Sequence, residues 1–267
     1  MAGLFGIAES SITSNARVKR YPSAAVLQVA NESIFRDAGF EPRTRLYSVS
    51  AKGEAANPER SLQSSRSRAK AAVRDITLCN RFEYFFTWTL SKNQIDRYDV
   101  SLISRRVQTF LKNAVHRKDF QYVLVPEYHK DGAIYFHGLC NLGNIRIERA
   151  ADARTRLPLS TNRGQPIFNM LDWKLGFSTC IPIDENYERT CNYLTKYLTK
   201  DSEKILGKWY LASRNLIKKP KIDLIFGGVD YDSFTKENPL LPIVPLYRDV
   251  AMAIMQQPLD MKEGDVI

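Results

Sequence analysis

The sequence contains few cysteines and histidines. Only four cysteines and three histidines occur among 267 residues, and no CxxC pair is present. The spacing of zinc fingers is therefore excluded, and we expect free thiols in a reducing compartment. The four cysteines are Cys79, Cys140, Cys180 and Cys191.

Long apolar runs are also missing. No segment approaches the roughly 20 apolar residues that cross a bilayer, and the first residues lack a basic patch followed by an apolar stretch. No segment matches the GxxxxGK[ST] pattern of phosphate-binding NTPases. We therefore expect a cytoplasmic protein with no membrane partner and no recognisable NTPase module.

Basic residues outnumber acidic ones. Thirty-nine Lys and Arg against 29 Asp and Glu give a net charge of +10. Such a surplus favours a polyanionic partner, most commonly nucleic acid, although many basic proteins bind none.

Hydrophobic patterning predicts an α+β fold. Asn57 is a suitable cap for a helix that begins at Pro58. The order of elements predicts an antiparallel sheet of about five strands with helices packed on one side. The expected elements are a helix at 58–78, a strand at 82–90, a helix at 101–117, a hairpin at 120–142, a strand at 173–183 and a helix at 186–206.

The chain ends differ in composition from the middle. We predict an N-terminal extension at 1–56, a central domain at 57–226 and a C-terminal extension at 227–267. The first extension is expected to be loosely structured, with a short strand at 44–50. The last is expected to contain a short helix at 249–257. Residues 143–170 are polar and predict a long loop.

The predicted hairpin places ionisable side chains on one face. Because alternate residues of a strand share a face, Glu127 and His129 point the same way, as do Tyr135 and His137. If the loop sets Glu127 opposite His137, then His129 lies opposite Tyr135. Such a set could bind a divalent metal with one side open to a phosphate. The alternative is a hairpin whose polar face is merely solvated.

The predicted helix at 186–206 carries a second unusual face. Tyr193, Lys196, Tyr197 and Lys200 follow the i, i+3, i+4, i+7 spacing of one stripe. A phenol becomes a useful nucleophile when cations or a metal-bound phosphate stabilise its anion. The alternative is an amphipathic helix that shows Tyr and Lys to solvent.

Basic residues continue beyond this stripe. Nine Lys and Arg between residues 189 and 221 face only two acidic residues, which suits a track for single-stranded nucleic acid. A solvated basic helix is the alternative. The candidate DNA-binding residues are Arg189, Lys204, Lys208, Arg214, Lys218 and Lys219.

Together these segments resemble the HUH endonucleases, and within them the replication initiators of phages and plasmids. Residues 126–139 are similar to the family pattern of Pro-Glu, Asp-Gly and then His-U-His-Gly-Leu, where U is apolar. Tyr135 stands where the first histidine is expected. Residues 85–90 resemble the family's first strand motif, and 193–200 resemble its YxxxY and YxxK tyrosine motifs.

The resemblance implies a rolling-circle replication initiator that nicks one strand of origin DNA. A tyrosine would form a 5′-phosphotyrosine and release a free 3′-OH. Mg²⁺ or Mn²⁺ would be held by Glu127, His137 and either His129 or Tyr135. A host helicase and polymerase would be further partners, in the host cytoplasm. Tyr193 is expected to cleave first because it lies nearer the helix N-terminus.

Two other functions remain open. Tyr135 in place of histidine favours an origin-binding or regulatory protein that no longer nicks DNA. A relaxase or transposase of the same superfamily is the nearer alternative, since it would use the same tyrosine chemistry.

Overall fold

The computed structural model describes residues 13–36, 56–200, 204–238, 243–245 and 249–255. Side chains are described in these ranges except at 199–200, 243–245, 249–251 and 253–255. The chain divides into two compact units. Asn57–Lys219 forms one, and Met1–Ala56 with Pro220–Ile267 forms the other. The two expected extensions thus fall in the same unit.

The larger unit is built on a seven-stranded sheet. All of its strand pairs are antiparallel, in the order β11-β6-β7-β5-β10-β9-β8. This confirms the predicted α+β class with an antiparallel sheet. The strands are β5 (Tyr84–Thr89), β6 (Gln121–Tyr128), β7 (Ile134–Asn141), β8 (Ile147–Arg149), β9 (Phe168–Met170), β10 (Ser178–Pro182) and β11 (Leu211–Ala212).

The sheet is wider than the expected five strands because three of its strands are very short. β8 and β9 lie inside the segment 143–170 that the sequence predicts as a loop, and β11 has only two residues. Strands of two or three residues are too short to show an alternating hydrophobic pattern, so sequence periodicity does not reveal them.

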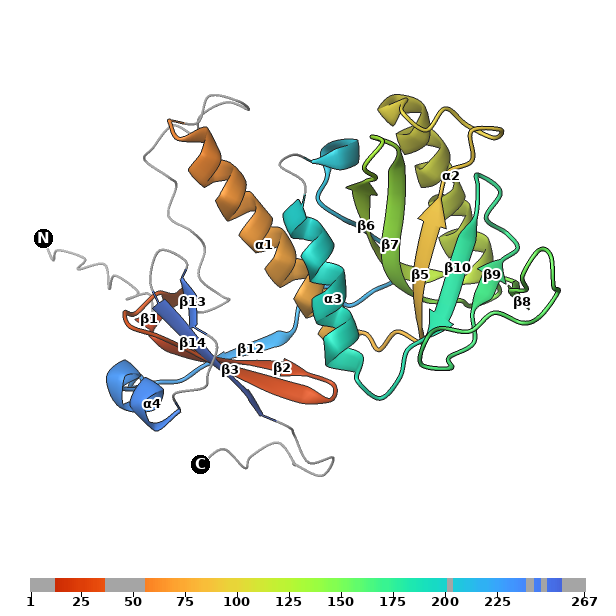
Figure 1. Ribbon diagram of the computed structural model, residues 1–267. Helices are drawn as coiled ribbons and strands as arrows, with labels where there is room; N and C mark the ends of the chain where they lie inside the picture. Colours follow the sequence, from red (N-terminus) through yellow and green to blue (C-terminus); the bar gives the residue numbers. More distant parts are fainter. Residues whose placement is uncertain (1–12, 37–55, 201–203, 239–242, 246–248, 256–267) are drawn as a thin grey trace, which may run out of the picture. The chain divides into compact units, whose positions relative to one another are not determined.

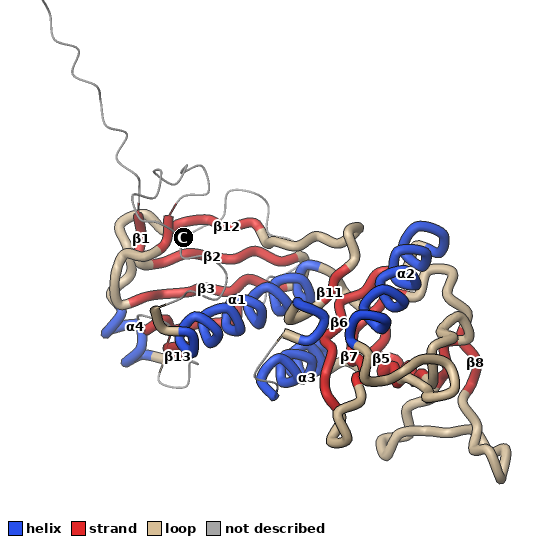
Figure 2. The backbone as a smooth tube through the Cα atoms, turned by 90° about the horizontal axis from the view of Figure 1, so that it is seen from above, coloured by secondary structure: helices blue, strands red, loops and turns tan. Residues whose placement is uncertain are grey.

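Helices cover both faces of this sheet, which corrects the expectation of one covered face. α2 (Val100–Lys118) packs on one face through Ile103, Val107 and Leu111. α1 (Pro58–Cys79) and α3 (Tyr187–Lys200) pack on the other. Figures 1 and 2 show the sheet between α2 and α3. Both faces are apolar enough to require cover, because strands β5, β6 and β7 are buried at both parities.

Local sequence explains the helix ends. The Asn57 side chain accepts a hydrogen bond of 2.9 Å from the Arg60 N–H, which caps α1 as predicted. α3 is shorter than the predicted 186–206. A separate 3₁₀ turn, η1 (Ile205–Gly207), follows residues 201–203, and Leu206 there adopts φ 54°. An α-helix cannot continue through this left-handed conformation.

The face under α2 is a dense aromatic core. The Trp88 ring stacks on Trp173 with centroids 4.3 Å apart and contacts Phe86 at 4.4 Å. Trp88 and Phe86 are both fully buried. Gly138 lies directly over the Phe86 ring, where an added Cβ would collide with it. A glycine after His137 therefore lets β5 and β7 pack this closely.

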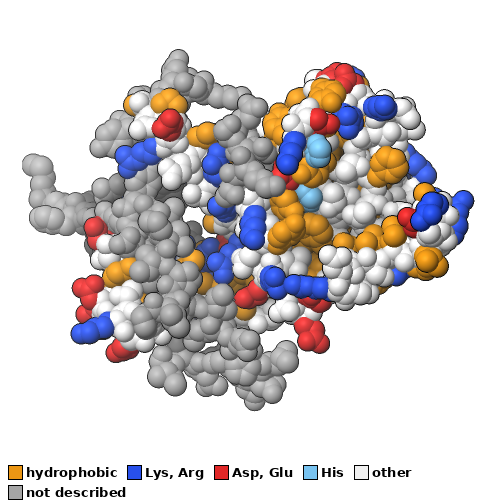
Figure 3. Space-filling view, in the orientation of Figure 1, with side chains coloured by type: hydrophobic (Ala, Val, Ile, Leu, Met, Phe, Trp, Pro, Cys, Tyr) orange, Lys and Arg blue, Asp and Glu red, His pale blue; other side chains and the backbone are white. Residues whose placement is uncertain are grey.

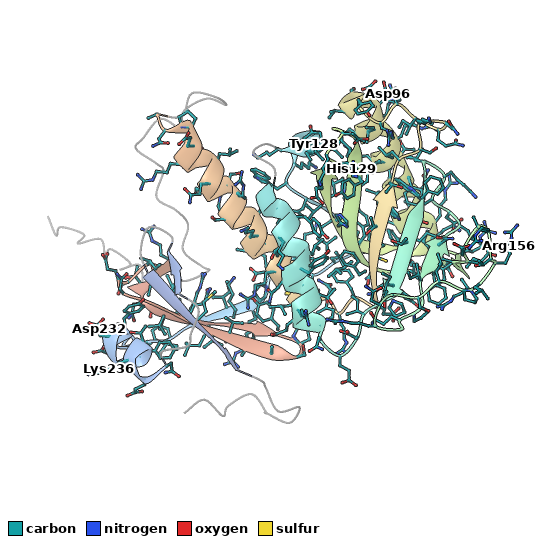
Figure 4. The ribbon with its side chains drawn as sticks, in the orientation of Figure 1. Asp96, Tyr128, His129, Arg156, Asp232 and Lys236 are labelled. Carbon is teal, nitrogen blue, oxygen red and sulfur yellow. The ribbon has the colours of Figure 1, made fainter. Side chains whose placement is uncertain are left out.

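The smaller unit contains a five-stranded antiparallel sheet, in the order β12-β2-β3-β14-β13. Its strands are β2 (Ala16–Tyr21), β3 (Ala24–Ala30), β12 (Lys221–Leu224), β13 (Ile243–Pro245) and β14 (Asp249–Met255). A two-stranded ribbon of β1 (Thr13–Ser14) and β4 (Phe35–Arg36) accompanies it, with helix α4 (Tyr231–Glu237), where Figure 4 labels Asp232 and Lys236.

Two expectations for this unit need comment. The predicted helix at 249–257 is wrong, because Asp249–Met255 is strand β14 and pairs with β3. The loosely structured N-terminal segment contains strands β2 and β3. The predicted strand at 44–50 lies outside the described residues. Among the described residues, no helix is long and apolar enough to cross a membrane.

Candidate active site

The β6–β7 hairpin fixes the first part of the site. Glu127 pairs with Tyr135, and Val125 pairs with His137. The register differs by two residues from the pairing of Glu127 with His137 considered above. A shift of two keeps every side chain on its face. Glu127, Tyr135 and His137 therefore share one face of the sheet, the face that α3 covers.

Glu127 and His137 meet across the hairpin. The Glu127 Oε2 and His137 Nε2 atoms are 3.1 Å apart, and the residues are only 2% and 8% exposed. Burial of a carboxylate is costly unless a proton, a cation or a hydrogen bond compensates for it. The predicted convergence of these two side chains across the hairpin is confirmed.

His137 has a defined orientation. Its Nδ1 atom lies 3.1 Å from the Thr87 hydroxyl oxygen on the neighbouring strand β5. With a proton on Nδ1, the imidazole donates to Thr87 and directs the Nε2 lone pair toward Glu127. Histidines that bind metals commonly hold their second nitrogen in this manner.

Helix α3 brings both predicted tyrosines to this face. The Tyr197 ring stacks on the His137 ring with centroids 3.9 Å apart and an interplanar angle of 14°. Tyr193 lies one turn earlier, with its centroid 5.2 Å from that of Tyr197 and 5.6 Å from that of Phe85. The carboxylate, the imidazole and two phenols thus gather in one place.

The two phenols differ in exposure. Tyr193 is 45% exposed, whereas Tyr197 is 7% exposed. Burial raises the pKa of Tyr197 well above its usual value of 10.0, and Tyr193, Glu127 and Tyr135 raise it further. Tyr197 therefore resists ionisation in this environment, while Tyr193 is accessible to a large substrate.

The lysines of the same stripe are placed only in part. Lys196 is exposed, and its Nζ lies 5.8 Å from the centroid of the Tyr193 ring. This position puts a cation beside the accessible phenol. The backbone of Lys200 ends α3, and its side chain lies outside the described part.

His129 takes a different position from the one the metal hypothesis needs. Its Nδ1 lies 3.0 Å from the Asp131 Oδ1 in the hairpin turn, and its side chain is 59% exposed. Figure 4 places it at the end of the hairpin. Tyr135 lies between the two histidines, with centroids 5.8 Å from His129 and 5.0 Å from His137.

Within the described residues, no group of three His, Cys, Asp or Glu side chains is close enough to hold a metal ion. Glu127 and His137 therefore stand as a pair, with the phenols of Tyr135 and Tyr197 as their neighbours. Two protein donors can suffice for Mg²⁺, which usually keeps several waters and takes further oxygens from a substrate phosphate.

Comparison with known proteins locates the family of this region. Residues 83–202 match a family model of replication-associated proteins of the ORF2 type. These residues belong to that family. The match begins just before β5 and ends just after α3, so it includes the whole cluster described above. No curated protein and no solved structure matches the chain.

The match in the replication-associated family stops before most of the predicted DNA-binding residues. Arg189 lies inside it, and the others follow it on the segment 204–219. All six are exposed. Lys204, Lys208 and Lys218 line an open hollow of about 400 Å³ together with Trp209 and Tyr210. Aromatic rings among cations are typical of sites for single-stranded nucleic acid.

Sequence reasoning missed two side chains of the replication-associated domain. Thr87 holds the His137 imidazole, and Phe85 packs against both His137 and Tyr193. Their shared parity in one strand places them on one face, but nothing local shows which face meets His137. Figure 3 shows two histidine side chains on the α3 side, bordered by hydrophobic surface.

Proposed function

We propose that this protein initiates rolling-circle replication by nicking one DNA strand with a tyrosine of α3. The observation that carries the proposal is the stack of Tyr197 on His137, because it joins the tyrosine helix to the Glu127–His137 pair. The family match covers the same elements. Neither segment alone would distinguish a nuclease from a solvated surface.

Glu127 and His137 would hold Mg²⁺ or Mn²⁺. A carboxylate oxygen and an imidazole nitrogen 3.1 Å apart suit such a cation, and Thr87 fixes the tautomer that leaves Nε2 free to bind it. When bound, the metal would supply Lewis-acid polarisation of the scissile phosphate. Tyr135 stands beside the pair, and His129 would join only if it left Asp131.

Tyr193 is the better nucleophile for the first cleavage because it is accessible and has Lys196 beside it. Its phenol oxygen attacks phosphorus, loses its proton to solvent, and the bond from phosphorus to the 3′ oxygen breaks. The products are a 5′-phosphotyrosine and a 3′-OH that takes up a proton. Tyr197 would then serve the second cleavage that transfers the strand.

The basic segment after α3 would hold the DNA strand near these tyrosines. Arg189 and the lysines of 204–219 are exposed, and an electrostatic track of this kind binds phosphates without regard to sequence. The free 3′-OH would prime a host polymerase, and a host helicase would unwind the nicked duplex. Lys200 would assist Tyr197, as the i+3 spacing suggests.

The test is a nicking assay on a supercoiled replicon that carries the cognate origin, with Mn²⁺ or with a chelator. We expect cleavage by the wild-type protein only with metal. The double variant Tyr193→Phe, Tyr197→Phe should keep DNA affinity, which comes mainly from backbone charge, and lose nicking. Cleavage that persists in the double variant would exclude the tyrosine mechanism.

One observation favours a second function, an origin-binding protein without nuclease activity. Tyr135 occupies the strand position opposite Glu127 where the family pattern has a histidine, so the pair lacks a second imidazole. A protein of this kind would bind origin DNA and leave it intact under every metal condition. The same nicking assay separates the two functions.

A further inference from the structure

A second basic surface lies away from the tyrosines. A groove of about 680 Å³ runs between α2 and the edge of the seven-stranded sheet. Its floor is β11 with Ser213, whose N–H donates to the Tyr122 carbonyl at 2.9 Å. Its basic lining residues are Arg105, Lys112, His116, Lys208 and Arg214.

The helical wall of the groove is a continuous stripe. Arg105, Thr109, Lys112 and His116 are spaced i, i+4, i+7, i+11, and all four are exposed. From the first to the last, the stripe is about 16 Å long. One strand of a duplex carries a phosphate every ~3.4 Å of axis, so the stripe spans about five phosphates.

No acidic side chain neutralises this surface locally. Helix α2 contains no Asp or Glu, and neither does the segment 204–219 that forms the opposite wall. Among the described residues, the cations Arg105, Lys112, Lys208 and Arg214 make no ion pair with a carboxylate. A concave surface lined by one sign of charge concentrates counter-ions and favours a polyanion.

The groove lacks the rings that a single strand would use. Tyr122 is its one aromatic lining residue apart from the His116 imidazole, and Tyr122 is 7% exposed. Burial raises the pKa of Tyr122 to about 12, so it adds no negative charge near neutral pH. The hollow with Trp209 and Tyr210 offers rings for unpaired bases, whereas this groove offers cations alone.

We propose that the groove between α2 and β11 binds the phosphate backbone of duplex DNA. The choice of DNA rests on the proposed function, while the choice of a duplex rests on the lining. α2 covers the sheet face opposite Tyr193 and Tyr197. The domain would thus contact a double-stranded part of its substrate on one side of the sheet and cleave a single strand on the other.

The test compares two double variants of the full chain that remove the same charge from the same helix. Arg105→Gln with Lys112→Gln alters the groove. Arg106→Gln with Arg117→Gln is the control, because both arginines are exposed and neither lines the groove. Affinity is measured by fluorescence anisotropy over a salt series, for a duplex of about 20 base pairs, roughly two helical turns, and for one of its strands.

The groove variant should lose roughly ten-fold in duplex affinity, and its salt slope should fall by about two phosphate contacts. Its affinity for the single strand, and both affinities of the control, should change by less than about three-fold. Circular dichroism and thermal melting establish that both variants are folded. Equal losses on duplex and single strand, or equal losses in both variants, would overturn the proposal.

This result is independent of the nuclease assay. A wild-type protein that binds duplex through the groove but never nicks contradicts the proposed function alone. A groove variant with unchanged duplex affinity in a protein that nicks contradicts the groove proposal alone.

Discussion

The two faces of the seven-stranded sheet differ in kind, and strand β5 shows the difference within six residues. Phe86 and Trp88 point toward α2 and are fully buried in an aromatic core. Phe85 and Thr87 point the other way and contact His137. One face consists of apolar side chains, and the other holds a buried carboxylate, an imidazole and two phenols.

The comparison teaches where stability and function separate. The α2 face gains free energy from apolar burial, at about 25 cal/mol per Å² of surface removed from water. On the α3 face, Glu127 and His137 are buried at a cost in desolvation that apolar residues of the same size would avoid. Such a cost, placed beside two tyrosines, is typical of a reactive site.

The largest effect is expected on the apolar face. Trp88→Ala removes a side chain that stacks on Trp173 and donates from Nε1 to the Met170 sulfur at 3.2 Å. We expect the free energy of unfolding to fall by about 3–5 kcal/mol. Urea denaturation followed by fluorescence measures it. A loss below about 1 kcal/mol would show that this face is not the main core.

The next effect should appear on the other face, as activity. Glu127→Gln keeps shape and removes the charge that faces His137, so nicking should fall about 100- to 1000-fold and Mn²⁺ affinity should drop. The free energy of unfolding should change by less than about 1 kcal/mol, because no buried charge is created. Initial nicking rates and calorimetric titration with Mn²⁺ give the two values.

Glu148→Gln is the matched control for this variant, because Glu148 is exposed on β8 in the same sheet. It should leave both nicking and Mn²⁺ affinity unchanged. Equal behaviour of the two variants would remove the distinction between the faces.

A smaller effect is expected from Thr87, which positions His137 and does not touch the substrate. Thr87→Val removes the hydroxyl 3.1 Å from Nδ1, and Mn²⁺ affinity and nicking should fall about ten-fold. Thr87→Ser should restore both, since it returns the hydroxyl. Failure of serine to rescue Mn²⁺ affinity would mean that the threonine methyl, and not the hydrogen bond, matters.

The smallest effect concerns the ionisation of Tyr197. Its pKa in the folded protein is raised, so the unfolded chain releases this proton first. The stabilising contribution is complete below about pH 10 and is lost as pH rises toward the folded pKa. Between about pH 9 and 10.5, wild type should lose about 1 kcal/mol more unfolding free energy than Tyr197→Phe. Parallel pH profiles would contradict the burial of this phenol.

Alternation along the strands made the α3 face predictable, but the register was not. Glu127 and His137 share a parity, so any even shift leaves them on one side. The pairing depends on the turn, where the His129 N–H donates to the Ala133 carbonyl at 2.7 Å. A turn centred one residue away would have moved Glu127 opposite His137, and local sequence does not distinguish these turns.

Other features depend on contacts far apart in the chain. Asp249–Met255 contains alanine and methionine, which favour a helix locally, yet it pairs with β3, whose residues lie near the start of the chain. The groove at α2 is formed by a helix at 100–118 and a segment near 210. Composition predicts that each is basic, but only the fold brings them together.

The most direct test of the tyrosine mechanism is to trap the covalent adduct between the wild-type protein and its cleaved DNA and to map it by mass spectrometry. After a single cleavage, the account predicts a 5′-phosphotyrosine on Tyr193, which is 45% exposed, and none on the buried Tyr197. An adduct only on Tyr197 would reverse the order of the two phenols. Nicking with no adduct on either tyrosine would contradict the mechanism itself.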